Sequence, residues 1–249
     1  LGTDFDKKYL DKVKTLSLSP EAIQKEHDLK IVFTPLHGTT YELVPASLRN
    51  WGFTNIHTVP EQSIPDGDFP TVASANPEEP AAFKMALDLA RKIDADLAMA
   101  CDPDGDRIGI AVKNDAGEWT LLNGNQTNII FTEYIIRRKK ELNQLKGGEY
   151  TVKTIVTTEL IKDIAEKNHI ICYDVYTGFK WIADVIRKEG GEKFIGGGEE
   201  SFGYMPGAFT RDKDGVSATS LMAEIAAWVK MQNKTLYSFL KEIYAKYGF

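Results

Sequence analysis

The sequence has little cysteine and no long apolar run. Two cysteines in 249 residues cannot supply a disulfide framework, which excludes the small disulfide-rich folds. No apolar stretch approaches the roughly 20 residues that cross a bilayer, and Leu1 to Asp4 do not begin a signal peptide. We expect Cys101 and Cys172 to be reduced core residues, and the protein to be cytoplasmic with no membrane contact.

Positive charge is also scarce. The chain has 30 Lys and Arg against 36 Asp and Glu, which gives a formal net charge of −6. A nucleic-acid footprint needs a basic stripe, and the one basic cluster, at residues 137–140, falls late in a predicted helix, where cations complement the helix dipole. We therefore expect no nucleic-acid partner.

The composition is that of an ordinary globular protein. Hydrophobic residues make up 43% of the chain and charged residues 27%, so a substantial core can form. The length allows one large α/β domain or two domains of common size.

In the first half of the chain, β-rich runs alternate with helical spacing after a helical lead-in. The lead-in covers residues 4–14 and 20–26, strands are predicted at 30–34, 55–59 and 96–101, and helices at 43–50 and 79–93. Residues 107–113 and 118–122 predict a β-hairpin. Alternating strands and helices favour a mostly parallel sheet, which the hairpin makes mixed.

The second half repeats this order. A helix is predicted from residues 123–124 toward the break at 147–148, strands at 152–157, 170–175 and 193–195, and helices at 159–167, 180–188, 217–230 and 236–247. The pattern predicts an α/β fold of two consecutive three-layer α/β domains with mixed, mostly parallel sheets. We place the domains at residues 1–120 and 121–249.

The most specific motif is the acidic loop, Asp102-Pro103-Asp104-Gly105-Asp106-Arg107, directly after a predicted strand. Carboxylates at alternate positions repel one another, and a divalent cation removes that repulsion. Hard oxygen ligands in a short loop suit Mg²⁺. An EF-hand is excluded because its sixth and twelfth positions are Arg107 and Lys113 here. The alternative is an acidic surface turn.

Two further loops follow predicted strands. Residues 196–204 are predicted to form a glycine-rich loop, in which Glu199 and Ser201 offer hydrogen-bonding groups for sugar hydroxyls, although a flexible linker is the alternative. Residues 176–181 join a strand to a helix whose first amides, with Lys180, could receive a phosphate or sugar oxygen. That second pattern is equally typical of an ordinary helix cap.

Taken in order, these motifs resemble the α-D-phosphohexomutase family of phosphoglucomutases and phosphomannomutases. The strings are T-P-L-H-G at 34–38, N-P-E-E-P at 76–80, D-P-D-G-D-R at 102–107, T-G-F-K at 177–180 and G-E-E-S-F-G at 198–203. The family has four domains around one cleft, and this chain is similar to the second and third. The phosphoserine domain and the phosphate-binding domain would be its partners within one protein.

The resemblance implies an intramolecular phosphotransferase of the isomerase class that acts on a phosphorylated hexose or pentose. It implies that an isolated central fragment is inactive. The site residues that it implies are Asp102, Asp104 and Asp106 as ligands of the cofactor Mg²⁺, Arg107 near the transferring phosphate, and Gly178, Lys180, Glu199 and Ser201 as substrate contacts.

The sequence departs from the family pattern in places. The family's nucleophile motif is S-H-N-P, and the nearest string, at residues 74–77, lacks the histidine and lies in the second-domain loop, so we do not expect Ser74 to be a nucleophile. Some members carry a histidine where Tyr204 stands, which leaves the general acid or base unassigned. We expect His37 to hold its own loop.

Other functions remain open from the sequence. One is a phosphopentomutase of the same family. Another is a haloacid-dehalogenase-like phosphatase, in which Asp102 would be a nucleophile that forms an aspartyl phosphate. A third is a phosphosugar-binding module that performs no catalysis.

Overall fold

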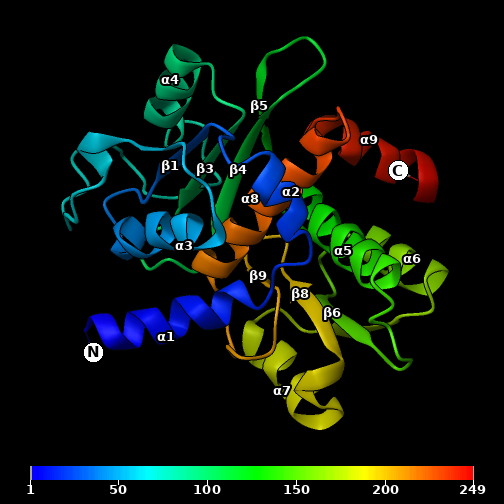
Figure 1. Cartoon of the computed structure of the whole chain (residues 1–249). Helices are drawn as coiled ribbons and strands as arrows, with labels where there is room; N and C mark the ends of the chain where they lie inside the picture. The colour runs from blue at the N-terminus through cyan, green and yellow to red at the C-terminus, as the bar shows by residue number, and fades with distance from the viewer. Residues whose placement is uncertain (1, 249) are drawn as a thin grey trace.

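The computed structural model, which describes residues 2–248, contains two β-sheets with helices packed around them (Figure 1). The first sheet has the strand order β2-β1-β3-β4-β5, and the second has the order β7-β6-β8-β9. In each sheet the first three strands are parallel and the strands after them are antiparallel. The predicted α/β class with two mixed sheets is confirmed.

The first sheet is built from short strands that are buried at its centre. The strands are β1 (Ile31–Thr34), β2 (Ile56–Thr58), β3 (Leu97–Cys101), β4 (Ile108–Lys113) and β5 (Trp119–Leu122). The helices of this half are α1 (Thr3–Lys14), α2 (Pro20–Lys25), α3 (Leu43–Trp51) and α4 (Lys84–Ile93), with 3₁₀ turns η1 (Thr39–Tyr41) and η2 (Pro60–Gln62).

The second sheet follows a long helix. Its strands are β6 (Tyr150–Thr154), β7 (Ile171–Val175), β8 (Phe194–Gly198) and β9 (Tyr204–Met205). Its helices are α5 (Gly124–Glu141), α6 (Leu160–Lys167), α7 (Phe179–Glu189), α8 (Gly215–Met231) and α9 (Leu236–Tyr247), with a 3₁₀ turn η3 (Gly191–Lys193). Asn123 begins α5 with a capping box closed by Gln126, as the predicted helix start requires.

Two predicted elements have different bounds in the structure. The helix predicted from residue 79 begins at Lys84, because Asn76 accepts hydrogen bonds from the amides of Glu78 and Glu79 and holds the chain in a turn. The strand predicted at 152–157 lies at 150–154, because the chain turns at Thr154, whose carbonyl accepts from the amide of Thr157 at 3.0 Å.

The glycines predicted to open a loop at residues 196–198 instead complete strand β8. They pair in parallel with residues 151–153 of β6. A β-carbon at Gly198 would lie 1.9 Å from Asn128 Oδ1 of α5, so the missing side chain lets this helix approach the strand closely. The loop that follows is therefore shorter than predicted.

Helix α8 lies between the two sheets (Figure 1). It packs against α2, α3, β3 and β4 of the first half and against β9 and α9 of the second. Its residues from Gly215 to Val229 are all buried, which fits a helix that, apart from Glu224, is apolar or small-sided on every face. One apolar cluster consequently contains residues from both halves. The boundary between residues 120 and 121 stays a prediction.

The two cysteines differ in burial. Cys101, at the end of β3, is fully buried as predicted. The prediction was wrong for Cys172, which is only partly buried because β7 is an edge strand with side chains at the surface. Both thiols are free. Within residues 2–248, no helix is both long and apolar enough to cross a membrane.

Candidate functional site

The acidic loop connects β3 to β4 at the carboxyl end of β3, where ligand sites form in α/β sheets. The loop after β1 supports it from one side. The amide of Thr39 donates to the carbonyl of Pro103 at 2.8 Å, and a β-carbon at Gly38 would lie 2.3 Å from Pro103 Cα. Gly38 therefore allows the two loops to touch.

The three aspartates of this loop can face a single ion. One carboxylate oxygen from each of Asp102, Asp104 and Asp106 lies within 4.8 Å of the others. Asp102 is buried, Asp106 is half-buried and Asp104 is exposed. Burial raises the pKa of Asp102 to about 6, although hydrogen bonds from Arg107 oppose the rise. Three carboxylate oxygens are hard donors of the kind that Mg²⁺ prefers. Because Asp104 is exposed to solvent, water or a phosphate could supply the remaining ligands of such an ion.

Two basic side chains contact these carboxylates. Arg107 Nε donates to Asp102 Oδ2 at 2.7 Å, and its Nη1 lies 3.2 Å from Glu78 Oε1. Lys213 Nζ lies 2.8 Å from Asp106 Oδ2. Sequence reasoning missed Lys213, because it lies far along the chain and nothing in its local spacing links it to the acidic loop.

Two of the predicted substrate residues come together. The amide of Gly178, at the start of α7, donates to Glu199 Oε1 at 2.5 Å. Glu199 follows β8, so the ends of β7 and β8 bring the two loops into contact. Burial raises the pKa of Glu199, and the Gly178 amide opposes that rise.

The other two predicted substrate residues are less tightly held. Lys180 is exposed, and its Nζ lies 5.4 Å from the centre of the Trp181 ring. Ser201 is half-buried in the turn between β8 and β9. Lys180 lies in the first turn of α7, directly after Gly178, and Ser201 lies two residues after Glu199, so both flank the Gly178–Glu199 contact along the chain.

Sequence reasoning also missed Glu200. Its Oε2 accepts from the hydroxyls of Thr154 and Thr157, at 3.2 and 3.0 Å. Glu199 and Glu200 therefore tie the loop after β8 to the loops after β7 and β6. The adjacent glutamates in G-E-E-S are the available signal, but nothing in their spacing separates a sugar contact from a residue that ties loops together.

The acidic loop and the sugar loop are joined directly. Arg107 and Gly203 form an antiparallel β-bridge, and the amide of Ile108 donates to the carbonyl of Phe202 at 3.0 Å. Lys213 completes the junction, since its Nζ lies 5.2 Å from the Phe179 ring centre and a β-carbon at Gly203 would meet its stem. The loops that carry the predicted metal ligands and the predicted sugar contacts therefore lie side by side.

Three further residues singled out in the sequence have partners of their own. Ser74 is half-buried and donates to Glu79 at 2.8 Å. His37 is buried and bonds through its two ring nitrogens to the Ile64 carbonyl and the Thr71 hydroxyl, which holds its loop as expected. Tyr204 is buried and stacked on Phe131, with ring centres 4.3 Å apart.

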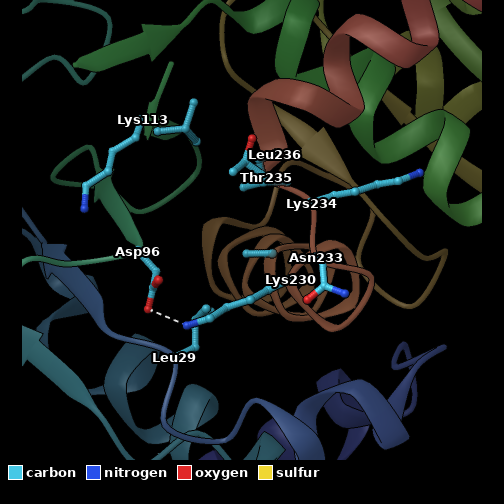
Figure 2. A pocket seen from close by; sticks show the side chains of 10 residues that line it. Leu29, Asp96, Lys113, Lys230, Asn233, Lys234, Thr235 and Leu236 are labelled. Atoms are coloured by element: carbon cyan, nitrogen blue, oxygen red, sulfur yellow. Dashed lines mark hydrogen bonds and ion pairs between the residues drawn. The ribbon is translucent and has the colours of Figure 1, made fainter. Parts of the chain in front are cut away.

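A cavity of about 370 Å³ lies at the other end of the first sheet (Figure 2). Lysines line it, but their ammonium groups do not converge on one point. Lys230 Nζ lies 3.0 Å from Asp96, and Lys113 and Lys234 extend in opposite directions, toward Asp94 and Glu242. We therefore place the candidate site at the junction of the two loops.

The fold and this junction define a class: an α/β protein whose strand ends hold an acidic triad beside a glycine- and glutamate-containing loop. Two family descriptions match the chain. "Phosphoglucomutase/phosphomannomutase, alpha/beta/alpha domain II" matches residues 7–117, and "alpha/beta/alpha domain III" of the same family matches residues 123–247. The chain belongs to the phosphoglucomutase/phosphomannomutase family and corresponds to its middle domains. The haloacid-dehalogenase alternative is thereby overturned.

Similar proteins agree with this assignment. Phosphoglucomutase from Staphylococcus aureus (strain MRSA252) is 39% identical over 222 residues, which are 89% of this chain and 40% of that protein. A Thermus thermophilus structure, provisionally assigned as a phosphomannomutase, has a TM-score of 0.78 at 22% identity and covers 99% of this chain and 52% of its own. A Burkholderia thailandensis family protein has a TM-score of 0.72 at 17% identity, covering 96% and 46%. The chain thus spans about 40% of the length of the curated relatives it matches.

Proposed function

We propose that this chain is the central portion of a phosphoglucomutase/phosphomannomutase, an enzyme that moves a phosphoryl group between hydroxyls of one phosphosugar. The observation that carries the proposal is the backbone bridge between Arg107 and Gly203. It places the acidic loop, where charge on a transferring phosphoryl group can be stabilised, beside the loop that carries Glu199 and Ser201.

In this proposal, the residues of the site have three roles: metal binding, phosphate binding and sugar binding. Asp102, Asp104 and Asp106 would hold Mg²⁺, which supplies electrostatic stabilisation of the transferred group when bound. Arg107 and Lys213 offer positive charge to phosphate oxygens at the same edge. Glu199 and Ser201 orient the sugar hydroxyls, while the Gly178 amide fixes the position of the Glu199 carboxylate.

The phosphoryl carrier lies outside these 249 residues in this proposal. A phosphoserine of another domain transfers its phosphoryl group to one sugar hydroxyl, and the bisphosphorylated sugar turns over in the cleft. Its other phosphoryl group then returns to the serine. The 249 residues contain no S-H-N-P string, and the hydroxyl of Ser74 donates to Glu79. The preferred sugar is a hexose or pentose phosphate.

Calorimetric titration with Mg²⁺ tests the metal part of the proposal. Asp102→Asn, Asp104→Asn and Asp106→Asn should each weaken binding by about tenfold or more, because each removes one of few charged ligands. Asp68→Asn removes the same charge from an exposed turn and should bind as the wild type does. Unchanged affinity in all three loop variants would remove Mg²⁺ from this loop.

An activity assay tests the assignment of the phosphoryl carrier. The purified chain, mixed with glucose 1-phosphate, a trace of glucose 1,6-bisphosphate and Mg²⁺, should form no glucose 6-phosphate above background. Turnover that disappears in Ser74→Ala would show that the nucleophile lies in this chain. Such a result would contradict the proposed role of a separate phosphoserine domain.

A further inference from the structure

The start of α8 is held between the lead-in helix α1 and the acidic loop. Tyr9 of α1 donates its hydroxyl hydrogen to Asp214 Oδ1 at 2.7 Å. On the other side, the amide of Gly215 donates to the carbonyl of Gly105 at 2.9 Å, and a β-carbon at Gly215 would lie 2.6 Å from that oxygen. This contact therefore joins α1 to the acidic loop through one helix terminus.

Asp214 fixes the geometry of that terminus. The same Oδ1 that accepts from Tyr9 also accepts from the amides of Val216 and Ser217, at 3.1 and 3.3 Å, so it caps α8. The side chain is 7% exposed. A buried carboxylate with three donors on one oxygen has little freedom to move, and the residue that precedes it shares that constraint.

That preceding residue is Lys213, whose ammonium contacts Asp106. Its stem lies against Gly203, and its Nζ lies 2.8 Å from Asp106 Oδ2. A divalent cation held by the three aspartates would meet this positive charge at short range. Repulsion between like charges lowers the affinity for the cation, and the effect depends on how firmly Lys213 is held in place.

We propose that Tyr9 and Asp214 are positioning residues that hold Lys213 against Asp106 and thereby set the divalent-cation affinity of the acidic loop. The inference rests on the proposed metal site. It assigns a role to the lead-in helix α1, which contains none of the sequence motifs. Tyr9 acts through Asp214 and Lys213 and has no contact with the aspartates of the loop among the described hydrogen bonds.

The experiment measures Mn²⁺ affinity of the whole 249-residue chain by electron paramagnetic resonance, with a melting temperature for each variant. Lys213→Met should bind Mn²⁺ about tenfold more tightly, because a nearby positive charge is removed. Tyr9→Phe should bind about two- to fourfold more tightly, since Lys213 is then less restrained. The double variant should match Lys213→Met alone.

Tyr150→Phe is the matched control. It also removes a hydrogen-bonded tyrosine hydroxyl, one that donates to the carbonyl of Gly190 at 2.9 Å in the second half of the chain. This variant should lose stability, as Tyr9→Phe does, while keeping wild-type Mn²⁺ affinity. The comparison separates a general loss of stability from a specific effect on the acidic loop.

The possible failures are distinguishable. Absence of Mn²⁺ binding in the wild-type chain would overturn the proposed metal site itself. If Lys213→Met tightens binding but Tyr9→Phe equals the wild type, the metal site stands and the positioning role is wrong. Weaker binding in Tyr9→Phe, or further tightening in the double variant over Lys213→Met, would likewise contradict it.

Discussion

Asp102 and Asp104 share one loop but differ in their surroundings. Asp102 accepts from the amides of Asp106 and Arg107, at 3.1 and 2.9 Å, and from Arg107 Nε, whereas Asp104 is exposed. Without metal, Asp102→Ala should lower the free energy of unfolding by about 2 kcal/mol, because it leaves these donors unpaired. Asp104→Ala should change it by less than about 0.5 kcal/mol.

Urea unfolding in the presence of a chelator measures both values. Equal losses in the two variants would mean that Asp102 has no structural role beyond that of Asp104. A larger loss in Asp102→Ala would separate the residue that shapes the loop from the one that serves mainly as a ligand.

At the residue scale, site residues that directly follow a strand could be predicted from the sequence. Site residues that reach the site only through tertiary packing could not. The three aspartates could be found because they are closely spaced and come directly after an apolar run. Lys213 could not, because its contact with Asp106 depends on where α8 begins in space. Glu200 could not be assigned a role because its partners, Thr154 and Thr157, lie at the end of β6 and in the turn after it, where the sequence pattern predicts one continuous strand.

At the scale of elements, Glu224 connects the lead-in to α5 and α8. This fully buried carboxylate accepts from the hydroxyl of Ser17, the amide of Leu18 at 2.8 Å and the hydroxyl of Tyr134 at 2.7 Å. Burial raises the pKa of Glu224 above its ordinary value of 4.5. The folded chain therefore binds more protons at this group than the unfolded chain does.

Stability should accordingly fall as pH rises from about 4.5 through the raised pKa, by at most about 1.4 kcal/mol per pH unit from this group. Glu224→Gln should lack that contribution, so the difference between its free energy of unfolding and that of the wild type should change with pH. Denaturant titrations from about pH 4.5 to about pH 8 measure this difference. The exposed Glu166→Gln serves as the control. A constant difference for Glu224→Gln would contradict the prediction.

The types of the elements could be predicted from the sequence. The predicted ends of elements were wrong where side-chain hydrogen bonds or close packing determine the backbone path. Alternating apolar runs predicted the strands and helices of both halves except β9, which begins at Tyr204, the last residue of the predicted glycine-rich loop. The late start of α4 depends on hydrogen bonds accepted by Asn76, and the extension of β8 through Gly198 depends on close contact with Asn128. Glycine usually favours a loop, so its packing role in a strand could not be recognised without the neighbouring helix.

At the scale of the molecule, we expect a single cooperative unfolding transition. The apolar cluster contains Leu48 of α3 and Leu221 of α8, and α8 packs on both halves. Residues 1–120, expressed alone, should lack a stable fold, because the surfaces of α2 and α3 that α8 covers would be exposed. Circular dichroism and urea unfolding of 1–120 and 121–249 check this. A cooperative transition in each piece would show independent domains.

Two sheets could be predicted from the order of elements, but their shared helix could not. Apart from Glu224, the buried part of α8 is apolar or small-sided on every face, which indicates burial without indicating which partners cover it. The family match at residues 7–117 and 123–247 likewise divides the chain without describing the contact between its parts.

The position of α8 between the sheets limits how this chain could be recombined with its relatives. A chimaera that exchanges residues 1–120 for the equivalent segment of another family member would set a foreign α2 and α3 against the native α8. At 39% identity, such surfaces differ enough that exchanging one side alone requires repacking of the other. Exchanging α8 together with the first half would preserve that interface, so the natural unit of recombination is discontinuous in sequence.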